Sequence, residues 1–151
     1  MFSVNASETE INTINGHDIY GFLIGDTIQV NIHHGVVLRF IHYGSGHRRC
    51  HIEVVIFGDT EKRLLAYLLQ HADGRVANYN EMLASVWKNN GLVASYKRLS
   101  QVAQSLKEKL SQSGLPDNFI RTVRNQGYSI EGHLITPLHY RVESLICKDR
   151  S

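Results

Sequence analysis

Short runs rich in isoleucine, valine, phenylalanine and tyrosine fill the first third of the chain. Four such runs span residues 19–24, 27–32, 36–43 and 51–57. The segments between the runs are turn formers, namely Gly25-Asp26, His34-Gly35 and Gly44-Ser45-Gly46. This pattern predicts an antiparallel meander of three or four strands. One face of such a small sheet must be covered, because an isolated small sheet is barely stable in water.

The hydrophobic period becomes helical after residue 58. A first helix is predicted to run to about residue 72, with Asp59 or Thr60 as its cap and Asp73-Gly74 as its end. Its apolar side holds Leu64, Leu65, Leu68 and Leu69 and is the expected cover of the sheet. Asn78 and Glu81 have the spacing of a capping box and predict the start of a second helix. The buried side of this second helix would hold Met82, Leu83, Val86 and Trp87.

A third helix is predicted over residues 95–110, after a loop at residues 88–94. Ser95 is its expected N-cap. One apolar stripe recurs at three- and four-residue intervals and consists of Leu99, Val102, Ala103, Leu106 and Leu110. The other side holds Lys97, Ser100, Gln101, Gln104 and Ser105. Amides and hydroxyls can read base edges. Taken alone, however, the same pattern also fits an ordinary amphipathic surface helix.

Two further strands follow Pro116. Residues 119–123 predict one strand, Arg124-Asn125-Gln126-Gly127 a hairpin turn, and residues 128–131 the return strand. The expected order is thus two helices, a loop, a polar-faced helix and a basic hairpin. This is the order of a winged helix-turn-helix. In that fold the third helix enters the major groove of DNA and the hairpin, or wing, reaches the neighbouring groove. The expected fold class is therefore α+β.

The chain divides into four expected segments. Residues 1–18 are polar, lack a period and predict a flexible tail. Residues 19–58 form the N-terminal antiparallel sheet, and residues 59–132 form the winged helix-turn-helix with its three helices and C-terminal wing. Residues 133–151 fit an extra strand, a short helix for dimerisation or the start of a linker, and the sequence does not choose among them.

Composition adds the distribution of charge. The 151 residues carry a formal net charge of +2, without a membrane-spanning run or a signal sequence, which predicts a soluble intracellular protein. The first eighteen residues contain Glu8, Glu10 and Asp18 but no lysine or arginine, whereas residues 95–110 contain three lysines and one arginine against Glu108. The basic charge thus falls on the predicted third helix.

Cysteines and histidines raise a metal-binding alternative. Cys50 and Cys147 lack the spacing of a disulfide scaffold or a four-thiolate zinc site. A short hairpin nevertheless holds His42, His47, Cys50 and His51, with His33 and His34 one strand away, which raises a zinc or copper site or a pH-sensing cluster as an alternative. Strand alternation sends neighbours to opposite faces, and the spacing matches no familiar zinc pattern, so no metal or cofactor is expected. Nucleotide-binding loops, nucleophile elbows and zinc-protease motifs are also lacking, which predicts no enzyme activity and no small-molecule substrate.

Several motifs in order resemble the DNA-binding domain of the OmpR/PhoB family of bacterial transcription regulators. They are residues 59–69, Gly74-Arg75-Val76, Glu81-Met82-Leu83, Val86-Trp87, and Ile120-Arg121-Thr122-Val123-Arg124 leading to Gly127-Tyr128. The resemblance covers roughly residues 20–132. The opening strand at residues 20–24, with no phosphoacceptor domain before it, is more similar to the ToxR/CadC branch. Members of that branch often carry a membrane span after this domain.

The resemblance implies a set of DNA-binding residues. Lys97, Ser100, Gln101, Gln104 and Ser105 occupy positions that face the groove in relatives, and Lys107 is added as a DNA-binding cation, with a simple solubilising charge as the alternative. In the wing, the Thr122 hydroxyl can bond a phosphate, Arg124 can enter a minor groove, and Tyr128 can brace the hairpin or touch the DNA backbone. The segment from Trp87 to Ala94 matches a loop that can contact RNA polymerase in relatives.

The recognition positions also depart from the family pattern. Many relatives have arginines where this chain has Gln104 and Ser105, and an apolar residue where it has Gln101. Fewer cations predict modest affinity of one domain for DNA, raised by pairing two copies on repeated half-sites. The expected protein is a cytoplasmic, nucleoid-associated regulator, membrane-tethered if this chain is a piece of a longer protein. The alternative is a winged-helix module that binds a protein or antagonises another regulator.

Overall fold

The computed structural model describes residues 13–14, 17–130 and 132–140. Its strands are β1 (Thr13–Ile14), β2 (His17–Ile24), β3 (Ile28–Asn31), β4 (Val36–Tyr43), β5 (His47–Val54), β6 (Val76–Asn78), β7 (Arg121–Val123), β8 (Gly127–Ser129) and β9 (Ile135–His139). Its α-helices are α2 (Asp59–His71), α3 (Tyr79–Met82) and α4 (Tyr96–Gln112). Within these described residues the chain forms an α+β fold with an N-terminal antiparallel sheet, three helices and a C-terminal hairpin, which confirms the predicted fold class.

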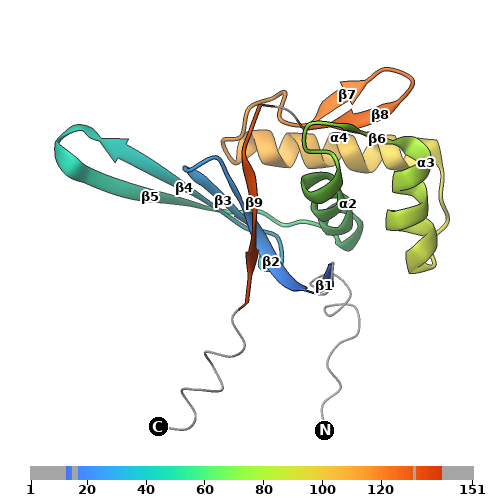
Figure 1. Ribbon diagram of the computed structural model, residues 1–151, viewed down its shortest axis with the longest axis horizontal. Helices are drawn as coiled ribbons and strands as arrows, with labels where there is room; N and C mark the ends of the chain where they lie inside the picture. Colours follow the sequence, from blue (N-terminus) through green and yellow to red (C-terminus); the bar gives the residue numbers. More distant parts are fainter. Residues whose placement is uncertain (1–12, 15–16, 131, 141–151) are drawn as a thin grey trace, which may run out of the picture.

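The N-terminal sheet contains the predicted meander as four consecutive antiparallel strands. Strands β2, β3, β4 and β5 pair in chain order, and β4 and β5 form a hairpin that projects from the body (Figure 1). The fourth strand begins at His47 instead of residue 51, because the whole of β5 pairs with β4, from His47 beside Tyr43 to Val54 beside Val36. In the predicted tail, β1 and the start of β2 already form a strand pair, whereas residues 1–12 lie outside the described part.

One face of this sheet is covered by α2. Phe22, Val30 and Val37 are buried on that face, and Leu64 and Leu68 of α2 are buried with them. The predicted cap of α2 was wrong. Gly58 is the N-cap, in an extended conformation, and its N–H donates to Oε1 of Glu61 over 2.7 Å.

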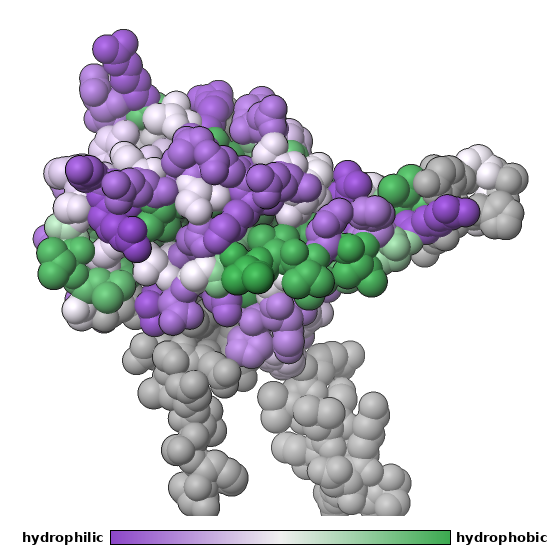
Figure 2. All heavy atoms as spheres, turned by 180° about the vertical axis from the view of Figure 1, so that it is seen from behind, coloured by the Kyte–Doolittle hydropathy of each residue, from purple (hydrophilic) through white to green (hydrophobic). Residues whose placement is uncertain are grey.

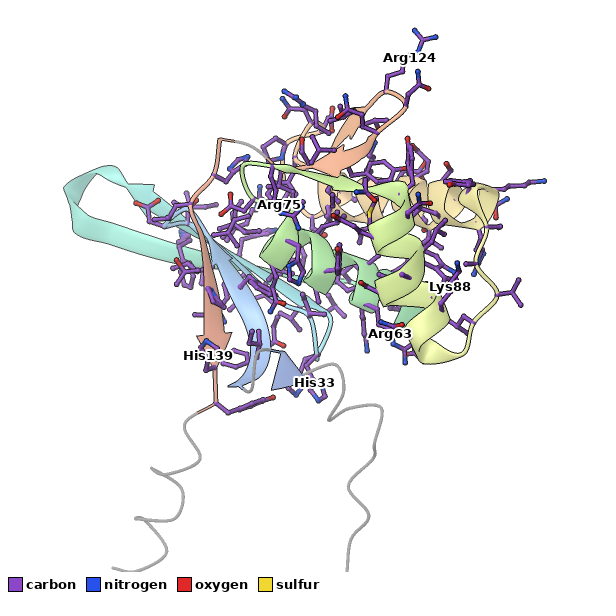
Figure 3. The ribbon with its side chains drawn as sticks, turned by 45° about the vertical axis from the view of Figure 1, so that its right-hand side comes forward. His33, Arg63, Arg75, Lys88, Arg124 and His139 are labelled. Atoms are coloured by element: carbon purple, nitrogen blue, oxygen red, sulfur yellow. The ribbon has the colours of Figure 1, made fainter. Side chains whose placement is uncertain are left out.

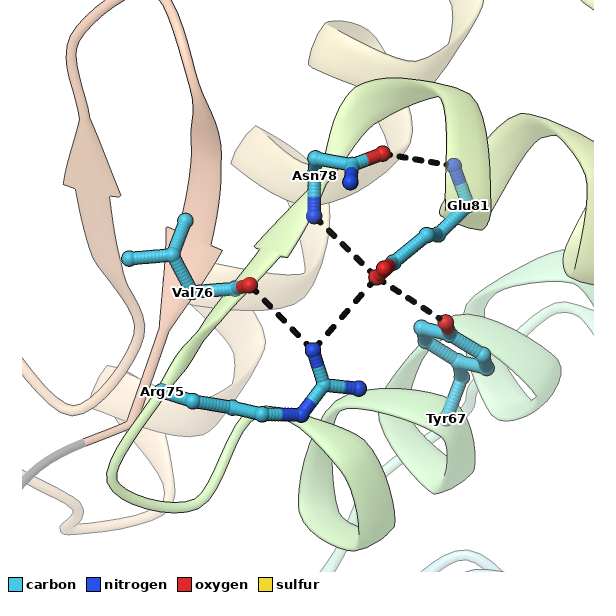
Figure 4. Close-up of polar contacts among 5 residues, drawn as sticks. All are labelled: Tyr67, Arg75, Val76, Asn78 and Glu81. Carbon is cyan, nitrogen blue, oxygen red and sulfur yellow. Dashed lines mark hydrogen bonds and ion pairs between the residues drawn. The ribbon is translucent and has the colours of Figure 1, made fainter.

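The predicted capping box at the start of α3 is confirmed (Figure 4). Oδ1 of Asn78 accepts the N–H of Glu81 over 2.9 Å, and Oε2 of Glu81 accepts the N–H of Asn78 over 3.4 Å. The same carboxylate oxygen lies 3.5 Å from Nη1 of Arg75 and 3.5 Å from the hydroxyl of Tyr67. Beyond α3 the helix continues as a wider π-turn at Leu83–Trp87 and a 3-10 turn at Lys88–Asn90, and Met82, Leu83, Val86 and Trp87 are buried as predicted.

The wing belongs to a second, three-stranded sheet in the order β6-β8-β7. The predicted first wing strand, residues 119–123, is shorter than expected because Phe119 and Ile120 are buried in the core and only Arg121–Val123 pairs. The return strand begins at Gly127, where β8 lies so close to β6 that a Cβ would overlap the carbonyl oxygen of Ala77. Asn125, in the turn between β7 and β8, has a φ of 63°.

The segment after the wing is a strand, one of the three forms that the sequence allows. Strand β9 pairs antiparallel with β2, from Ile135 beside Ile24 to His139 beside Ile19. The sheet thus runs in the order β9-β2-β3-β4-β5. Residues 141–151 lie outside the described part. In the part that the structure describes, no helix has the length and apolar character needed to cross a membrane.

Candidate functional site

Helix α4 is the longest helix of the described chain and is built as the sequence predicts. Oγ of Ser95 accepts the N–H of Arg98 over 3.1 Å, which confirms the predicted N-cap. The apolar stripe Leu99, Val102, Ala103, Leu106 and Leu110 is buried. The helix extends two residues beyond the expected end, to Gln112, where the capping Ser113 hydroxyl donates back to the carbonyl oxygen of Lys109 over 2.8 Å.

The opposite side of α4 exposes the polar residues of its first half. Lys97, Ser100, Gln101 and Gln104 are all exposed to solvent. Nε2 of Gln104 donates to Oε1 of Glu108 over 3.3 Å, so one carboxylate lies at the end of this face. We call these four exposed residues the α4 face. Their side chains present two amides, one hydroxyl and one ammonium group.

Ser105 lies apart from the α4 face and contacts α2. Its hydroxyl donates to Oε2 of Glu61 over 2.7 Å, while Nζ of Lys109 donates to Oε1 of Glu61 over 2.6 Å. The same Lys109 ammonium donates to the carbonyl oxygen of Ile56 over 2.7 Å. Burial raises the pKa of Glu61, but the hydrogen bonds from Lys109, the Gly58 N–H and Ser105 outweigh burial and lower the pKa. Glu61 is therefore a carboxylate that fixes α4 against the start of α2.

Three further predicted site residues meet where α4 packs on the wing. Nζ of Lys107 donates to Oγ1 of Thr122 over 2.5 Å and lies 5.2 Å from the ring centroid of Tyr128. Burial lowers the pKa of Lys107. Tyr128 is buried, which raises its pKa, and its hydroxyl is hydrogen-bonded to Ser100. These contacts orient the wing relative to the α4 face.

Arg124 lies at the tip of the wing. It is exposed, and Figure 3 shows its side chain extending away from the body of the molecule. The turn that carries it is closed by a hydrogen bond from the N–H of Gln126 to the carbonyl oxygen of Val123 over 3.0 Å. The geometry thus places a single guanidinium group at the end of a short, defined hairpin.

Sequence reasoning missed a polar hollow beside the α4 face. The hollow lies between the starts of α3 and α4 and the wing turn, and its lining includes Asn80, Tyr96, Asn125 and Gln126. The hydroxyl of Tyr96 donates to Oδ1 of Asn80 over 2.8 Å, although the ring remains 57% exposed. These residues come from three separate segments, so no local pattern in the sequence brings them together.

The loop predicted to contact RNA polymerase exposes Lys88, Asn89 and residues 91–93. Trp87 is buried, as expected for a core residue, whereas Val93 is 89% exposed. Gly91 turns the chain with a φ of 72°, and the N–H of Leu92 donates to the carbonyl oxygen of Trp87 over 2.9 Å. The loop therefore presents an apolar side chain on a hydrogen-bonded turn.

The histidine-rich hairpin brings together no metal-binding group among the residues that the structure describes. Cys50 and His51 are exposed on β5, and Nε2 of His51 lies 3.0 Å from Oε1 of Glu53. No cluster of three or more histidine, cysteine, aspartate or glutamate side chains occurs in the described part of the chain. The side chains of His42 and His47, and Cys147, lie outside the described part.

Comparisons with known proteins identify the family of this chain. Residues 53–130 match the family model described as "Transcriptional regulatory protein, C terminal". Over 78 residues the chain is 31% identical to the "Cholera toxin homolog transcriptional activator" of Vibrio parahaemolyticus serotype O3:K6 (strain RIMD 2210633). This match covers 52% of the chain and 26% of the relative, so the chain spans about a quarter of that relative's length.

One solved structure is similar in fold, and a second gives a weaker alignment. The DNA-binding domain of E. coli CadC aligns with 82% of this chain and 99% of its own length, at 19% identity and a TM-score of 0.55. The DNA-binding domain of the response regulator AdeR, solved in complex with an intercistronic region, aligns with 71% of this chain and 96% of its own length, at 16% identity and a TM-score of 0.49.

Proposed function

Because the chain belongs to the transcriptional regulatory protein family that this C-terminal-domain model describes, we propose that it binds duplex DNA with α4 in the major groove and the wing in the adjacent minor groove. The predicted resemblance to the OmpR/PhoB-type domain and its ToxR/CadC branch is confirmed by the family match, the curated relative and the fold. Family and fold are those of transcription regulators and not of enzymes. Binding to duplex DNA places the site of action in the cytoplasm, at the nucleoid.

The observation that carries the proposal is the exposed α4 face beside the tip of the wing. A helix that buries its apolar stripe and leaves amides and a hydroxyl in solvent has the groups needed to read base edges. Arg124 supplies a cation from a separate element, and a narrow minor groove attracts guanidinium groups. The two elements are held in one orientation by the contacts of Lys107 and Tyr128.

The predicted site residues divide into two proposed roles. Gln101 and Gln104 read base edges, Lys97 contacts a phosphate, and Arg124 enters the minor groove. The other predicted residues position these groups or add phosphate contacts at the junction of α4, α2 and the wing. These residues are Ser100, Ser105, Lys107, Thr122 and Tyr128. Exposed cations are few on the α4 face, so the affinity of one copy is modest and two copies on repeated half-sites raise it.

RNA polymerase is the proposed second partner, through the loop from Trp87 to Ala94. Val93 is the most exposed large apolar residue of the described chain and its neighbour Leu92 is also exposed, so the loop offers a small apolar surface for a protein partner to bury. No metal, cofactor or small-molecule substrate enters the proposal.

The salt dependence of binding to random duplex DNA tests the central proposal. Fluorescence anisotropy between 50 and 200 mM salt should show an affinity that falls steeply, roughly one power of the salt concentration per phosphate contact. Arg124→Ala should weaken binding to most sequences and reduce the salt slope by about 1. Arg63→Ala removes the same charge at a site well apart from the wing (Figure 3) and should leave binding unchanged.

Two results would contradict the proposal. Binding that is undetectable at 50 mM salt would favour the alternative of a winged-helix module that recognises a protein or antagonises another regulator. Equal losses for Arg124→Ala and Arg63→Ala would show that only overall charge matters and that the wing makes no specific contact.

A further inference from the structure

Among the strands that the structure describes, β5 forms an open edge of the N-terminal sheet, and it carries a row of exposed apolar side chains. Ile52, Val54 and, just beyond the strand, Ile56 are 61%, 76% and 83% exposed. Their two-residue spacing places them on the sheet face that α2 does not cover. Figure 2 shows apolar side chains gathered along the projecting hairpin and the adjoining body. An exposed edge with such a row is a template for pairing with another strand.

The opposite edge of the same sheet is protected. Strand β9 forms that edge and contains Pro137, which has no N–H to donate to an added strand. The contrast shows that edge pairing is blocked at one side of the sheet and left open at the other, along the eight residues of β5.

The charges of β5 indicate what pairs with it. Arg49, His51 and Glu53 alternate on the other face of the strand, with the acidic residue toward its C-terminal end and the basic residues before it. In an antiparallel pair of two identical strands, the C-terminal end of each lies beside the N-terminal part of the other. The carboxylate of each copy would then face a basic side chain of the other, which favours self-pairing over pairing with a uniformly charged strand.

We propose that two copies of this chain associate through β5, antiparallel, with a two-fold axis perpendicular to the sheet at His51. Residues 48–54 of each strand then pair, Arg49 lies opposite the partner's Glu53 on one face, and Cys50 lies opposite the partner's Ile52 on the other. If the two-fold axis passed one residue earlier, at Cys50, Arg49 would lie opposite the partner's His51. If the axis passed one residue later, at Ile52, Arg49 would lie opposite the partner's Val55, which is buried in each copy.

This dimer has a consequence that rests on the proposed DNA binding. A two-fold axis relates the two α4 faces, so the two half-sites would be inverted repeats and not direct repeats. Inverted and direct repeats of one half-site therefore distinguish this assembly from a head-to-tail arrangement of independent copies.

Sedimentation of the full chain without DNA tests the dimer over a concentration series. The wild type should dimerise below about 100 μM, and Glu53→Lys should weaken the dimer at least tenfold because the introduced ammonium group would face Arg49 of the partner subunit. The double variant Arg49→Glu with Glu53→Lys restores opposite charges and should restore dimerisation. Thr136→Lys adds a cation to the exposed surface of the opposite edge strand and should change nothing.

The sedimentation experiment tests the dimer independently of DNA binding. A wild type that stays monomeric over the series, a double variant that does not recover, or equal losses for Glu53→Lys and Thr136→Lys would each overturn the dimer. Circular dichroism of each variant separates loss of pairing from loss of fold. Because no DNA is present, failure of the dimer leaves the proposed DNA binding standing, and failure of DNA binding leaves the dimer standing.

Discussion

Single side chains on the α4 face carry the proposed sequence readout. Gln104 is exposed in the middle of α4, and its amide donates a hydrogen bond to Glu108 of the same helix. An amide can make a paired contact with adenine, and within the α4 face only Gln101 carries a second one. The readout therefore depends on one or two residues and not on the helix as a whole.

Replacing Gln104 by alanine should change sequence preference more than overall affinity. If the amide contacts a base pair, Gln104→Ala costs about 1 to 3 kcal/mol at that position and little elsewhere. Selection of bound fragments followed by titration of single-base variants measures this change. Gln112→Ala removes the same exposed amide at the end of α4 and serves as the control. Identical preferences in all three proteins would contradict the assignment.

Glu61 should make stability depend on acid pH. Its pKa is lowered in the folded protein, so its carboxylate contributes stability above an unfolded-state pKa of about 4.3, and this contribution is lost as the pH falls through the folded-state pKa. Glu61→Gln should lower the free energy of unfolding at pH 7 by about 1 to 3 kcal/mol, because Lys109 and Ser105 lose a charged acceptor.

Urea unfolding at pH 7 and near pH 3 measures the effect. The difference between wild type and Glu61→Gln should shrink as the pH falls, because protonation of Glu61 removes the charge that the variant lacks. Asp59→Asn changes an exposed carboxylate in the same helical turn and should cost less. A constant difference at both pH values would show that the charge of Glu61 does not stabilise the fold.

At the scale of elements, the wing depends on how closely β8 approaches β6. Gly127 faces the carbonyl oxygen of Ala77 across that pair, so any side chain forces the strands apart. Gly127→Ala should lower the free energy of unfolding by about 3 kcal/mol or more and loosen the wing. Gly44→Ala, where a Cβ meets no atom within 4 Å, is the matched control in chemical denaturation. Equal stabilities of the two variants would contradict this close approach.

The loop between α3 and α4 should affect transcription separately from DNA binding. Val93→Asp places a charge on the exposed apolar residue that we propose as the polymerase contact, so transcript levels should change several-fold while operator affinity stays the same. Leu134→Asp, on another exposed apolar residue outside this loop, is the control. Parallel changes in affinity and transcript level would assign Val93 to the DNA interface instead.

At the scale of the whole molecule, the segment after the wing closes the N-terminal sheet. Strand β9 pairs with β2 from Ile135 to His139, and the ring of Tyr140 lies 5.0 Å from that of Tyr20. Deleting residues 133–151 should lower the free energy of unfolding by about 2 to 4 kcal/mol, since each lost ladder bond costs roughly 0.5 to 1.5 kcal/mol. Deleting residues 142–151 keeps β9 and serves as the control in thermal unfolding. Equal melting temperatures for both deletions would contradict the role of β9.

The sequence alone determined the elements and their buried sides. Periodicity identified the stripe from Leu99 to Leu110, and local chemistry identified the caps at Asn78 and Ser95, because both signals involve residues three or four positions apart. The fold class followed from the order of these elements, and the family from the motifs that they carry. The structure shows which of the predicted DNA-binding residues are exposed. That they contact DNA remains a prediction.

Only the tertiary structure decided which polar groups meet. Glu61 and Ser105 are 44 positions apart, β9 pairs with the first long strand of the sheet, and Tyr96 meets Asn80 across a loop. Contacts of this kind depend on how helices and strands pack, and packing is set by the shared core rather than by any local pattern. For that reason the sequence could predict which side of α4 is polar. Only the packed molecule shows which of these polar residues face solvent and which, such as Ser105, hold the helix in place.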